Sequence, residues 1–557
     1  MIRQSIIDSL LKLVDKENCN LVAVFHSSDP LHGDFSTNLA MKLSAKLKKS
    51  PMLIAKDLKI KFPKSKLIEK IEVVAPGYLN FFLKEKVYLS NLEEIIKTKN
   101  DYGKGKLHQD KKIMIEFAHP NPFKIMHIGH LRNIILGESL VRIFEFQGAK
   151  VIRTNYQGDV GMHVAKCIWA MSKVSIKNYP KDINDRVAFL GQCYSEGATV
   201  FEKNDRVKAE ITEINQKIYE KKDKNIMKLW ALGVSWSLAK FREIYQRLDS
   251  YFDKEYMESE TLQLGMKFVK EALKKGILTK SQGAVVFKGD KYGLDTRVFL
   301  NKQGFLTYEG KELGLSYLEF TDFGKLDLCI HNVAVEQISF FKVTFKVESL
   351  LNPKLFKDRQ YHNAYEFVGL KSGKMSSRKG QVIPAEDILN QANQKIREII
   401  KSKTKLSPLD IDRIAVSAIK YAYLKMSPFK YLAFDLDSSV SFSGDSGPYL
   451  QYTYARIQSI LAKNENKSST EKQSVNKEEK LILKKLMQFE QSIKDAAINY
   501  SPSYIASYLN DLAQLFNNYY SKHQIIGNEF RIKLAIATSQ VIKNGLYLLG
   551  IKTVDKM

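Results

Sequence analysis

Hydrophobic and polar positions divide the first 105 residues into helical, strand-like and linker segments. Apolar residues recur at the helical period in the N-terminal stretch "MIRQSIIDSLLKLVDKEN". After "HGDFSTNLAMKLSAKLKK", the pattern becomes strand-like in "IEKIEVVAPGYLNFFL", with a turn at Pro76 and Gly77. A polar, glycine-bearing linker follows in "KTKNDYGKGK". Residues 1–105 are therefore predicted to form a first α/β unit.

A strand–helix–strand pattern follows the linker. Short apolar runs occur in "KIMIEF" and in "KVIRTNY". Between them lies "LRNIILGESLVRIFEFQG", whose apolar residues have mostly helical spacing and which stops at Gly148. Strand, helix and strand within about 45 residues have the length of a parallel crossover unit. The pattern predicts a Rossmann-type parallel-sheet domain.

The same periodicities divide the rest of the chain. Residues 163–275 are mostly helical and charged, and we interpret them as an insertion into the sheet domain. Short strands return in "GAVVFKG", "TRVFLNKQGFLTY" and "KLDLCIHNVAVEQ". From about residue 405 the pattern is all helix. We predict a multidomain α/β protein with a parallel-sheet domain at 106–400 and an all-α domain at 401–557.

Composition narrows the class of protein. The 557 residues carry a formal net charge of +26, which favours a polyanionic partner such as nucleic acid, or else a lysine-rich surface produced by coding bias. The four cysteines form no C-x-x-C pair, so a zinc ribbon is not expected and a reducing compartment is. Neither a signal peptide nor a run of roughly 18 apolar residues is present. We therefore expect a soluble, cytoplasmic protein.

The first candidate site is the stretch "HPNPFKIMHIGHLRN", which places His127 and His130 three residues apart at the start of a predicted helix. A helix N-terminus offers unpaired N–H groups and partial positive charge to phosphate, and Gly129 leaves room for a nucleotide. The imidazoles could stabilise charge as an α-phosphate becomes five-coordinate. The alternatives are a metal pair with His119 or His163, and a solvated helix cap.

The second candidate site is the loop "GKMSSRKG". Its basic residues Lys374, Arg378 and Lys379 could clamp the β- and γ-phosphates of a nucleotide or the departing pyrophosphate. The alternative is an exposed basic loop without a partner.

Together the two motifs resemble the signature pair of the class I aminoacyl-tRNA synthetases. Further stretches resemble the arginyl-tRNA synthetases: "IEFAHPNPFKIMHIGHLRN", "TNYQGDVG", "TYEGKELG", "KYAYLKMSP", "GPYLQYTYARIQSIL", "LFNNYY" and "NGLYLLGIKTVDKM". The segments "HGDFSTNLA" and "APGYLNFFL" resemble that family's additional N-terminal domain. The likeness covers nearly the whole chain in the expected order and leaves only the inserted helices weakly matched.

The resemblance implies an arginine–tRNA ligase. Arginine and ATP, with Mg²⁺, would give arginyl-adenylate, and the arginyl group would pass to the 3′ end of tRNA(Arg), with activation dependent on bound tRNA. It implies an N-terminal tRNA-binding domain at 1–105, a class I catalytic domain at 106–400 and an anticodon-binding domain at 401–557. We expect a monomer without a protein-bound structural metal.

The resemblance also assigns residues. For ATP it implies His127, Gly129, His130, Lys374, Met375, Ser376, Ser377 and Arg378, of which His127, His130 and Lys374 are catalytic together with Lys124. For arginine it implies Glu116 and Asn121 at the ammonium and carboxylate end, and Tyr308, Glu312 and Gln337 near the guanidinium. A guanidinium favours carboxylates in fork geometry. Alternatively, Glu312 pairs with a lysine on an exposed helix face and Tyr308 is a core aromatic.

This chain departs from the family pattern at two positions. Glu312 stands where the family usually has aspartate, which moves the carboxylate by roughly one methylene and requires a rearranged pocket or a bridging water. Ser377 replaces the second lysine of the signature loop. We hypothesise that Lys124 supplies the missing positive charge. The alternatives to this assignment are another class I synthetase or a non-catalytic tRNA-binding paralogue.

The C-terminal segment mixes aromatic and basic residues that could stack on unpaired anticodon bases. The predicted tRNA contacts are Tyr449, Tyr452, Arg456 and Tyr519. Helical periodicity requires that some of the aromatic residues in this segment belong to the core instead.

Overall fold

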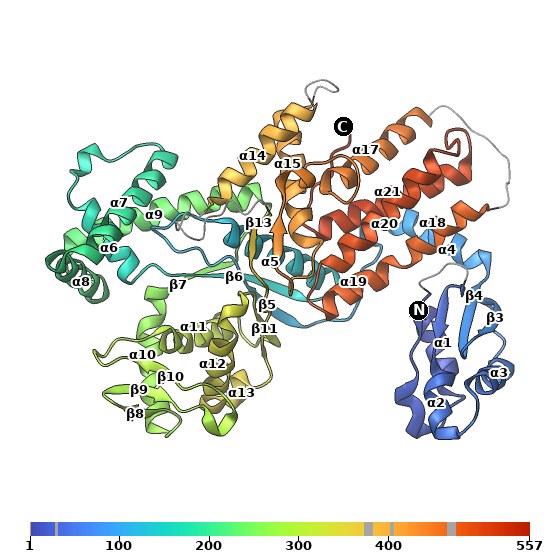
Figure 1. The fold of residues 1–557 in the computed structure, drawn as a ribbon, viewed down its shortest axis with the longest axis horizontal. Coiled ribbons are helices and arrows are strands. Elements are labelled where there is room, and N and C mark those ends of the chain that lie inside the picture. The colour runs from blue at the N-terminus through green and yellow to red at the C-terminus, as the bar shows by residue number, and fades with distance from the viewer. Residues whose placement is uncertain (1, 28–31, 372–382, 401–405, 465–474) are drawn as a thin grey trace. The chain divides into compact units, whose positions relative to one another are not determined.

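The computed structural model describes residues 2–27, 32–371, 383–400, 406–464 and 475–557 (Figure 1). Two compact units are present. Unit 1 contains residues 1–103, 453–492 and 508–544, and unit 2 contains residues 104–452, 493–507 and 545–557. Both units combine segments that lie far apart in the sequence.

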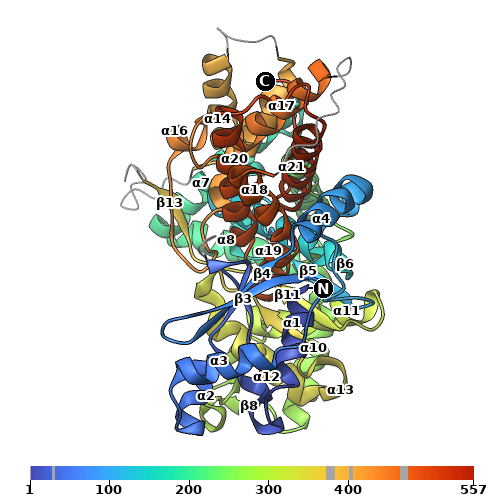
Figure 2. The same cartoon turned by 90° about the vertical axis from the view of Figure 1, so that its right-hand side faces the viewer.

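The N-terminal part of unit 1 is a four-stranded sheet with strand order β1-β2-β4-β3. Figure 2 labels β3 and β4 of this sheet. Its neighbouring strands pair antiparallel. The strands are β1 (Phe25–His26), β2 (Phe35–Thr37), β3 (Ile68–Val74) and β4 (Tyr78–Leu83). The predicted strand-like run is confirmed, because Pro76 and Gly77 separate β3 from β4. Helices α2 (Leu39–Leu47) and α3 (Pro51–Lys61) pack against this sheet.

The other helices of unit 1 come from both ends of the chain. They are α1 (Ile2–Leu11), α4 (Glu85–Thr98), α18 (Lys477–Met487) and most of α20 (Ser503–Tyr520) and α21 (Glu529–Leu548). Two contacts tie the N-terminal sheet and its linker to these helices. The Lys484 ammonium lies 3.3 Å from the Asp34 carboxylate, and the rings of Tyr102 and Phe489 stack with centroids 6.1 Å apart. Unit 1 is therefore held together by packing between its N-terminal and C-terminal segments.

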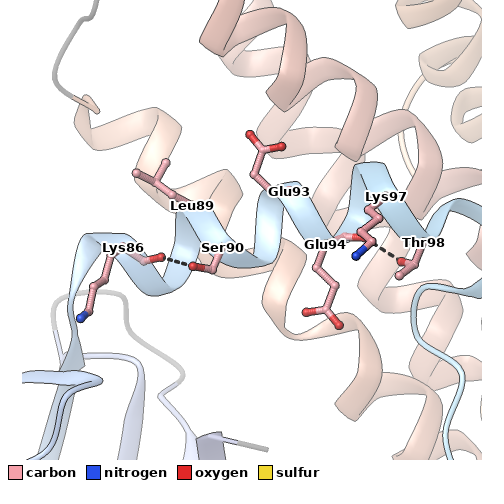
Figure 3. Close-up of a pocket in the computed structure, with 7 residues that line it drawn as sticks. All are labelled: Lys86, Leu89, Ser90, Glu93, Glu94, Lys97 and Thr98. Carbon is pink, nitrogen blue, oxygen red and sulfur yellow. Dashed lines mark hydrogen bonds between the residues drawn. The ribbon is translucent and has the colours of Figure 1, made fainter.

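A surface pocket of unit 1 runs along α4 (Figure 3). Its lining residues are Lys86, Leu89, Ser90, Glu93, Glu94, Lys97 and Thr98. Their polar groups are partly engaged locally, since the Ser90 and Thr98 hydroxyls donate to carbonyls one turn earlier and Glu93 pairs with Lys533 at 3.1 Å. None of the residues predicted for catalysis or binding lines this pocket.

Unit 2 is built on a five-stranded parallel sheet with strand order β12-β11-β5-β6-β7 (Figure 1). The strands are β5 (Lys112–Glu116), β6 (Lys150–Gln157), β7 (Lys254–Met257), β11 (Leu328–His331) and β12 (Gln360–His362). The first strand of this sheet, β5, lies in the middle. The later strands follow outward in chain order on both sides of it, β6 and β7 on one side and β11 and β12 on the other. Open sheets of this type bind ligands beyond the carboxyl ends of the strands, where the order reverses, here between β5 and β11.

The helix that follows β5 is buried on nearly all sides. Helix α5 (Ile128–Phe146) buries apolar residues together with polar ones such as Arg132, Glu138 and Arg142, as a helix in the centre of a large domain can when its polar groups have partners. The chain terminus is attached to it: the Ser139 hydroxyl donates to the Leu548 carbonyl at 2.8 Å and Arg142 to the Tyr547 carbonyl at 3.2 Å. Lys420 donates to the Gly550 carbonyl at 2.5 Å.

The predicted helical insertion is present but contains one strand of the sheet. Helices α6 (Met162–Met171), α7 (Ile183–Lys203), α8 (Asp205–Glu220) and α9 (Lys224–Arg247) share a hydrophobic core. β7 follows α9 and pairs with β6, so residues 254–257 belong to the sheet and not to the insertion. Four residues are too few for periodicity to distinguish a strand from the flanking helices.

Helices α10 (Glu258–Lys274) and α11 (Tyr308–Asp322) touch through glycine. A Cβ added at Gly314 would lie 2.3 Å from the Thr261 carbonyl oxygen, and one added at Gly265 would lie 2.4 Å from the Gly310 carbonyl oxygen. Both contacts are with backbone, so the helix axes can approach only because side chains are absent there. Nearby elements are β8 (Thr279–Ser281), β9 (Ala284–Phe287), β10 (Arg297–Leu300), α12 (Ile338–Leu351) and α13 (Pro353–Phe356).

The remaining elements are α14 (Ala385–Ile400), α15 (Pro408–Leu424), α16 (Leu436–Ser439), α17 (Gly447–Asn464) and α19 (Phe489–Ile498), with β13 (Val368–Leu370) and β14 (Leu432–Phe434). The expectation of helix throughout the region after residue 405 is wrong at β14, which pairs parallel with β13. A three-residue strand formed by a distant partner leaves no periodic signal. None of the described helices has the length and apolar character needed to cross a membrane.

We predict that Gly314→Ala lowers the free energy of unfolding by about 1–3 kcal/mol, because the new methyl group collides with backbone atoms of α10. The matched control is Gly191→Ala on α7, where the added Cβ meets only the flexible end of Ile125 at 3.2 Å. There the higher helix propensity of alanine should leave stability unchanged or raise it by up to about 1 kcal/mol. Urea denaturation measures both, and equal effects would contradict the prediction.

Candidate active site

The loop between β5 and α5 is held in an unusual backbone conformation. Ala118, His119 and Phe123 have φ angles of +85°, +52° and +65°. Side chains from three elements hold this backbone: the Ala118 N–H donates to Asn133 at 2.9 Å, the His119 N–H to Asn155 at 3.0 Å and the Phe123 N–H to Ser237 at 2.9 Å. Strained backbone that is fixed in this way is typical of functional sites.

His127 and His130 lie together at the start of α5, as predicted. Their ring centroids are 3.8 Å apart. The Gly129 N–H donates to His127 Nδ1 and the His127 N–H donates to His130 Nδ1, both at 3.1 Å. Because each Nδ1 accepts a hydrogen bond, each neutral ring carries its proton on Nε2. Two Nε2–H donors are thereby set at the carboxyl end of the central strand.

Both imidazoles are neutral near pH 7. Burial lowers the pKa of His130 well below its usual value, with further lowering by His127, His119 and Lys124. Burial and then Lys124 lower the pKa of His127. These neutral rings can therefore stabilise charge only as hydrogen-bond donors.

The helix start is less open to an anion than the sequence suggested. The Ile128 N–H donates to the Ile383 carbonyl at 3.2 Å, and the Gly129 N–H is taken by His127. A Cβ at Gly129 would lie 2.9 Å from His127 Cε1. Glycine is therefore required at this position so that the His127 ring can fold back over the helix, and the expected unpaired N–H groups are partly occupied by the protein.

Lys124 is close enough to influence these histidines. Its charge lowers the pKa of His127, His130 and His163. Its own pKa is lowered by burial and then by Lys166, and its ammonium lies 5.6 Å from the centroid of the Tyr194 ring. The structure therefore places a partly buried cation next to the histidine pair.

Three buried carboxyls from three elements, which we call the acidic pocket, lie near the carboxyl end of the sheet, where Glu116 ends β5 and Glu258 follows β7. Burial, and then the charges of Glu258, Glu312 and Glu116, raise the pKa of Tyr156 on β6 well above its usual value, so all three carboxyls lie within electrostatic range of this ring. All three carboxyls are buried. Where such a buried carboxyl group lacks a basic partner, its burial is costly, which favours a cationic ligand.

Glu116 already has partners at its place on β5. His331 lies opposite it on β11, and His331 Nδ1 is 2.5 Å from the Glu116 carboxylate. His119 Nδ1 lies 3.5 Å from the other carboxylate oxygen. Burial alone would raise the pKa of Glu116, but His119, His331 and His362 lower it. The histidines therefore favour the ionised form of Glu116.

Glu312 is the member with an unsatisfied oxygen. It is 5% exposed, and its Oε1 has no hydrogen-bond partner among the described residues. Burial raises its pKa well above the usual value, and Glu116, Glu348 and Glu309 raise it further. The alternative that Glu312 pairs with a lysine on an exposed face is therefore wrong. Tyr308 and Gln337 are exposed, Tyr308 by 72%, so Tyr308 is not a core aromatic either.

Glu258 was missed by sequence reasoning. It is the first residue of α10, directly after β7, and its position is fixed because Asp159 accepts the Ser259 N–H at 2.8 Å. A Cβ at Gly158 would lie 2.7 Å from Asn121 Oδ1 and 3.0 Å from Glu258 Oε2. Asn121 also accepts the Gly158 N–H at 3.0 Å. Only recognition of β7 as a sheet strand would have placed Glu258 at this edge.

His163, whose role the sequence leaves open, lies at the same glycine. Its Nε2 lies 3.1 Å from the Gly158 carbonyl oxygen. Burial, and then the charge of Lys124, lower its pKa to about 4. His163 therefore packs as a neutral ring between the acidic pocket and Lys124.

The described residues contain one set of donor atoms that could bind a metal ion. Glu319, Cys329 and His331 each place a donor atom within 4.8 Å of the other two, and all three are fully buried. The expectation that the protein binds no structural metal stays a prediction.

The residues predicted in the phosphate-binding loop lie outside the described part of the chain, whereas those predicted to contact tRNA lie within it. Lys374, Met375, Ser376, Ser377 and Arg378 lie outside the described residues. Tyr449, Tyr452 and Arg456 all lie on α17 and are each only partly buried. Tyr519 is 1% exposed and donates to Glu479 at 2.9 Å, which leaves no ring surface for stacking on a base. The prediction that Tyr519 contacts tRNA is therefore inconsistent with its position in the core.

Models of known protein families match most of the chain. Residues 91–436 match the family model for the class I tRNA synthetase (R) catalytic domain. Residues 450–557 match the DALR anticodon binding domain and residues 1–83 the arginyl tRNA synthetase N terminal domain. The chain belongs to the arginyl-tRNA synthetase family. The resemblance inferred from the sequence is thus confirmed, and the alternative of a different class I synthetase is excluded.

Relatives of this family match over nearly their whole lengths. An arginine–tRNA ligase of Fusobacterium nucleatum is 34% identical, with 94% of this chain and 93% of the relative covered. One from Treponema denticola is 32% identical, with 100% and 99% covered. Among solved structures, the arginyl-tRNA synthetase of Thermus thermophilus has a TM-score of 0.82 at 23% identity, with 100% of this chain and 99% of that chain covered, and therefore supports the fold.

We predict that stability falls as the pH drops from about 6.5 towards 4, partly because of His163. Its pKa is about 4 in the folded protein and 6.5 in the unfolded chain, so below pH 6.5 the unfolded state binds the additional proton. Stability from this group is complete above pH 6.5 and is lost on acidification, by on the order of 2–3 kcal/mol. Urea denaturation between pH 7 and 4 should show a smaller loss in His163→Gln. An identical pH profile in the variant would refute this assignment.

Proposed function

We propose that this chain activates arginine with ATP, accompanied by Mg²⁺, and transfers the arginyl group to the 3′ end of tRNA(Arg). The observation that carries the proposal is the direct neighbourhood of two chemically different sites. The donors of His127 and His130 suit phosphate oxygens, and the buried carboxyls of Glu116, Glu258 and Glu312 suit a cation. His119 connects the two sites, because its Nδ1 lies 3.5 Å from the Glu116 carboxylate and its charge lowers the pKa of His130.

The first step needs position and hydrogen bonding more than a protein nucleophile. The substrate carboxylate attacks the α-phosphate and pyrophosphate departs, so catalysis depends on orientation and on stabilising the five-coordinate phosphorus. The two Nε2–H groups are fixed donors for phosphate oxygens because their Nδ1 atoms are held by backbone N–H groups. Lys124 supplies positive charge beside them, in place of the lysine that Ser377 replaces, and Lys374 with its loop completes the phosphate contacts.

The arginine side chain is proposed to enter the acidic pocket. Its guanidinium would meet the unsatisfied Oε1 of Glu312 and convert a buried, protonated carboxyl into an ion pair. Asn121 would orient the carboxylate end and Glu116 the ammonium. Tyr308 and Gln337, both exposed, would complete the guanidinium contacts at the pocket entrance.

The tRNA is proposed to bind through both chain ends. The net charge of +26 favours binding to its phosphate backbone. On α17, Tyr449, Tyr452 and Arg456 recur at helical spacing and would contact anticodon bases, whereas residues 1–105 would contact the body of the tRNA. In this proposal the catalytic domain spans 106–400, the anticodon-binding domain 401–557, and the protein acts as a monomer.

Arginine-dependent ATP–pyrophosphate exchange, measured with and without tRNA(Arg), tests the proposal. We expect exchange that requires both arginine and tRNA, and loss of at least about 100-fold in kcat/KM for arginine in Glu312→Gln, which cannot ionise. Tight tRNA binding without any exchange would instead identify a non-catalytic tRNA-binding paralogue. Exchange that does not require tRNA would disprove only the tRNA dependence.

We predict that Lys124→Ala lowers kcat of the exchange about 10- to 100-fold, because the charge beside His127 and His130 is removed, and that Lys124→Arg retains part of the rate. Lys173→Ala is the matched control, since Lys173 is exposed and lies over the Trp169 ring. Unchanged activation in Lys124→Ala would show that Ser377 is not compensated by Lys124.

A further inference from the structure

The acidic pocket contains a lysine of its own. Lys311 lies in the first turn of α11, which begins at the exposed Tyr308, yet it is only 6% exposed. Its ammonium forms an ion pair with the Glu258 carboxylate and donates to the Tyr219 hydroxyl at 3.3 Å. Glu258 is 5% exposed, so the pair is enclosed by protein. A buried cation thus occupies part of a pocket that suits a cationic substrate.

The surroundings of Lys311 have the chemistry that a guanidinium requires. The Lys311 ammonium lies 5.4 Å from the centroid of the Tyr308 ring and 5.8 Å from that of the Tyr219 ring. A carboxylate flanked by aromatic faces binds ammonium and guanidinium groups alike. Glu312, the next residue, keeps an oxygen without a partner among the described residues.

The position of Lys311 is fixed by the helices and not by the ion pair alone. Gly265, Gly310 and Gly314 bring α10 and α11 into backbone contact, which carries the first residue of α10 to the first turns of α11. The lysine side chain itself has four rotatable bonds and can leave Glu258 without movement of either helix. The backbone is therefore rigid, while the ion pair is exchangeable.

We propose that Lys311 is an internal competitor of arginine: its ammonium occupies the Glu258 carboxylate in the substrate-free enzyme and must be displaced when the substrate guanidinium binds. This inference rests on the proposed function and adds a specificity element to it. A guanidinium can displace the ammonium because it bonds a carboxylate through two parallel N–H groups, whereas an ammonium is a single charged point. Ligands that are neutral or that carry only an ammonium gain too little binding free energy at Glu258 to replace Lys311. Lys311 therefore favours binding of arginine over lysine.

Competition of this kind has a defined kinetic signature. If the pocket is open for only a fraction of the time, the apparent dissociation constant is the intrinsic constant divided by that fraction. Removal of the competitor should then lower KM for arginine without changing kcat. A lysine that merely supports Glu258 predicts the opposite, because burial raises the pKa of Glu258 and Lys311 opposes this rise.

The test compares wild type, Lys311→Met and Lys311→Arg in exchange assays at pH 8.5, where ionisation of Glu258 depends least on Lys311, with saturating ATP and tRNA. We expect KM for arginine to fall about 3- to 10-fold in Lys311→Met and to rise about 10-fold in Lys311→Arg, whose guanidinium holds Glu258 more tightly. The value of kcat should change less than twofold in both. A higher KM in Lys311→Met with an unchanged melting temperature would overturn the proposal.

Two further measurements keep the result decisive. If Lys311→Met does not fold, an unchanged KM in Lys311→Arg, which preserves charge and size, contradicts competition. In Lys311→Ala, propylamine should bind in place of the missing part of the side chain and inhibit competitively with arginine, and it should not inhibit the wild type. Absence of this inhibition in a folded Lys311→Ala would also contradict the proposal. Absence of exchange in the wild type would instead refute the proposed function, independently of Lys311.

Discussion

The reciprocal hydrogen bonds between His127 and His130 determine how the rest of the site can work. Each ring gives its Nδ1 to a backbone N–H at the start of α5, and this fixes the tautomer, the ring orientation and the neutral state together. The histidines thereby cap the helix and leave two oriented donors at the edge of the sheet. Positive charge must then come from elsewhere, and we propose Lys124 for this role because its charge lowers the pKa of both rings.

The acidic pocket has the opposite electrostatic character. Glu116, Glu258 and Glu312 are buried around Tyr156 in a chain whose net charge is +26. The surroundings of these carboxyls differ: His119 and His331 lower the pKa of Glu116, burial raises the pKa of Glu312, and Lys311 pairs with Glu258. A buried carboxyl oxygen without a partner among the described residues, such as Glu312 Oε1, is costly, and this cost supports the proposed selectivity towards a cation.

Sequence patterns predicted much of the fold because the decisive signals are local. The run that became β5, the helix that became α5 and the turn between β3 and β4 each have a clear period or a proline–glycine pair. β7 and β14 were missed because each has only three or four residues and pairs with a strand that is distant in the sequence, so the local pattern does not indicate it. Glu258 was missed for the same reason, since nothing near it in the sequence indicates that its strand ends at the edge of the sheet.

The predicted site was incomplete in a related way. Spacing placed His127 beside His130 correctly, yet it could not show that their rings take up the N–H groups that a phosphate was expected to bind. Burial separates Glu312, which is enclosed, from Tyr308, which is 72% exposed, although the two are one turn apart. It also assigns Tyr519 to the core. The side on which a helix meets its neighbours is a tertiary property, and a single sequence reveals it only in part.

The attachment of the chain terminus to α5 has a consequence for synthesis of the protein on the ribosome. Ser139 and Arg142 bind carbonyls that lie 409 and 405 residues further along the chain. The central helix can therefore complete these hydrogen bonds only after residues 547 and 548 have emerged, whereas the strands beside it can pair much earlier. Packing around the central helix is in this sense finished long after its own residues have been translated.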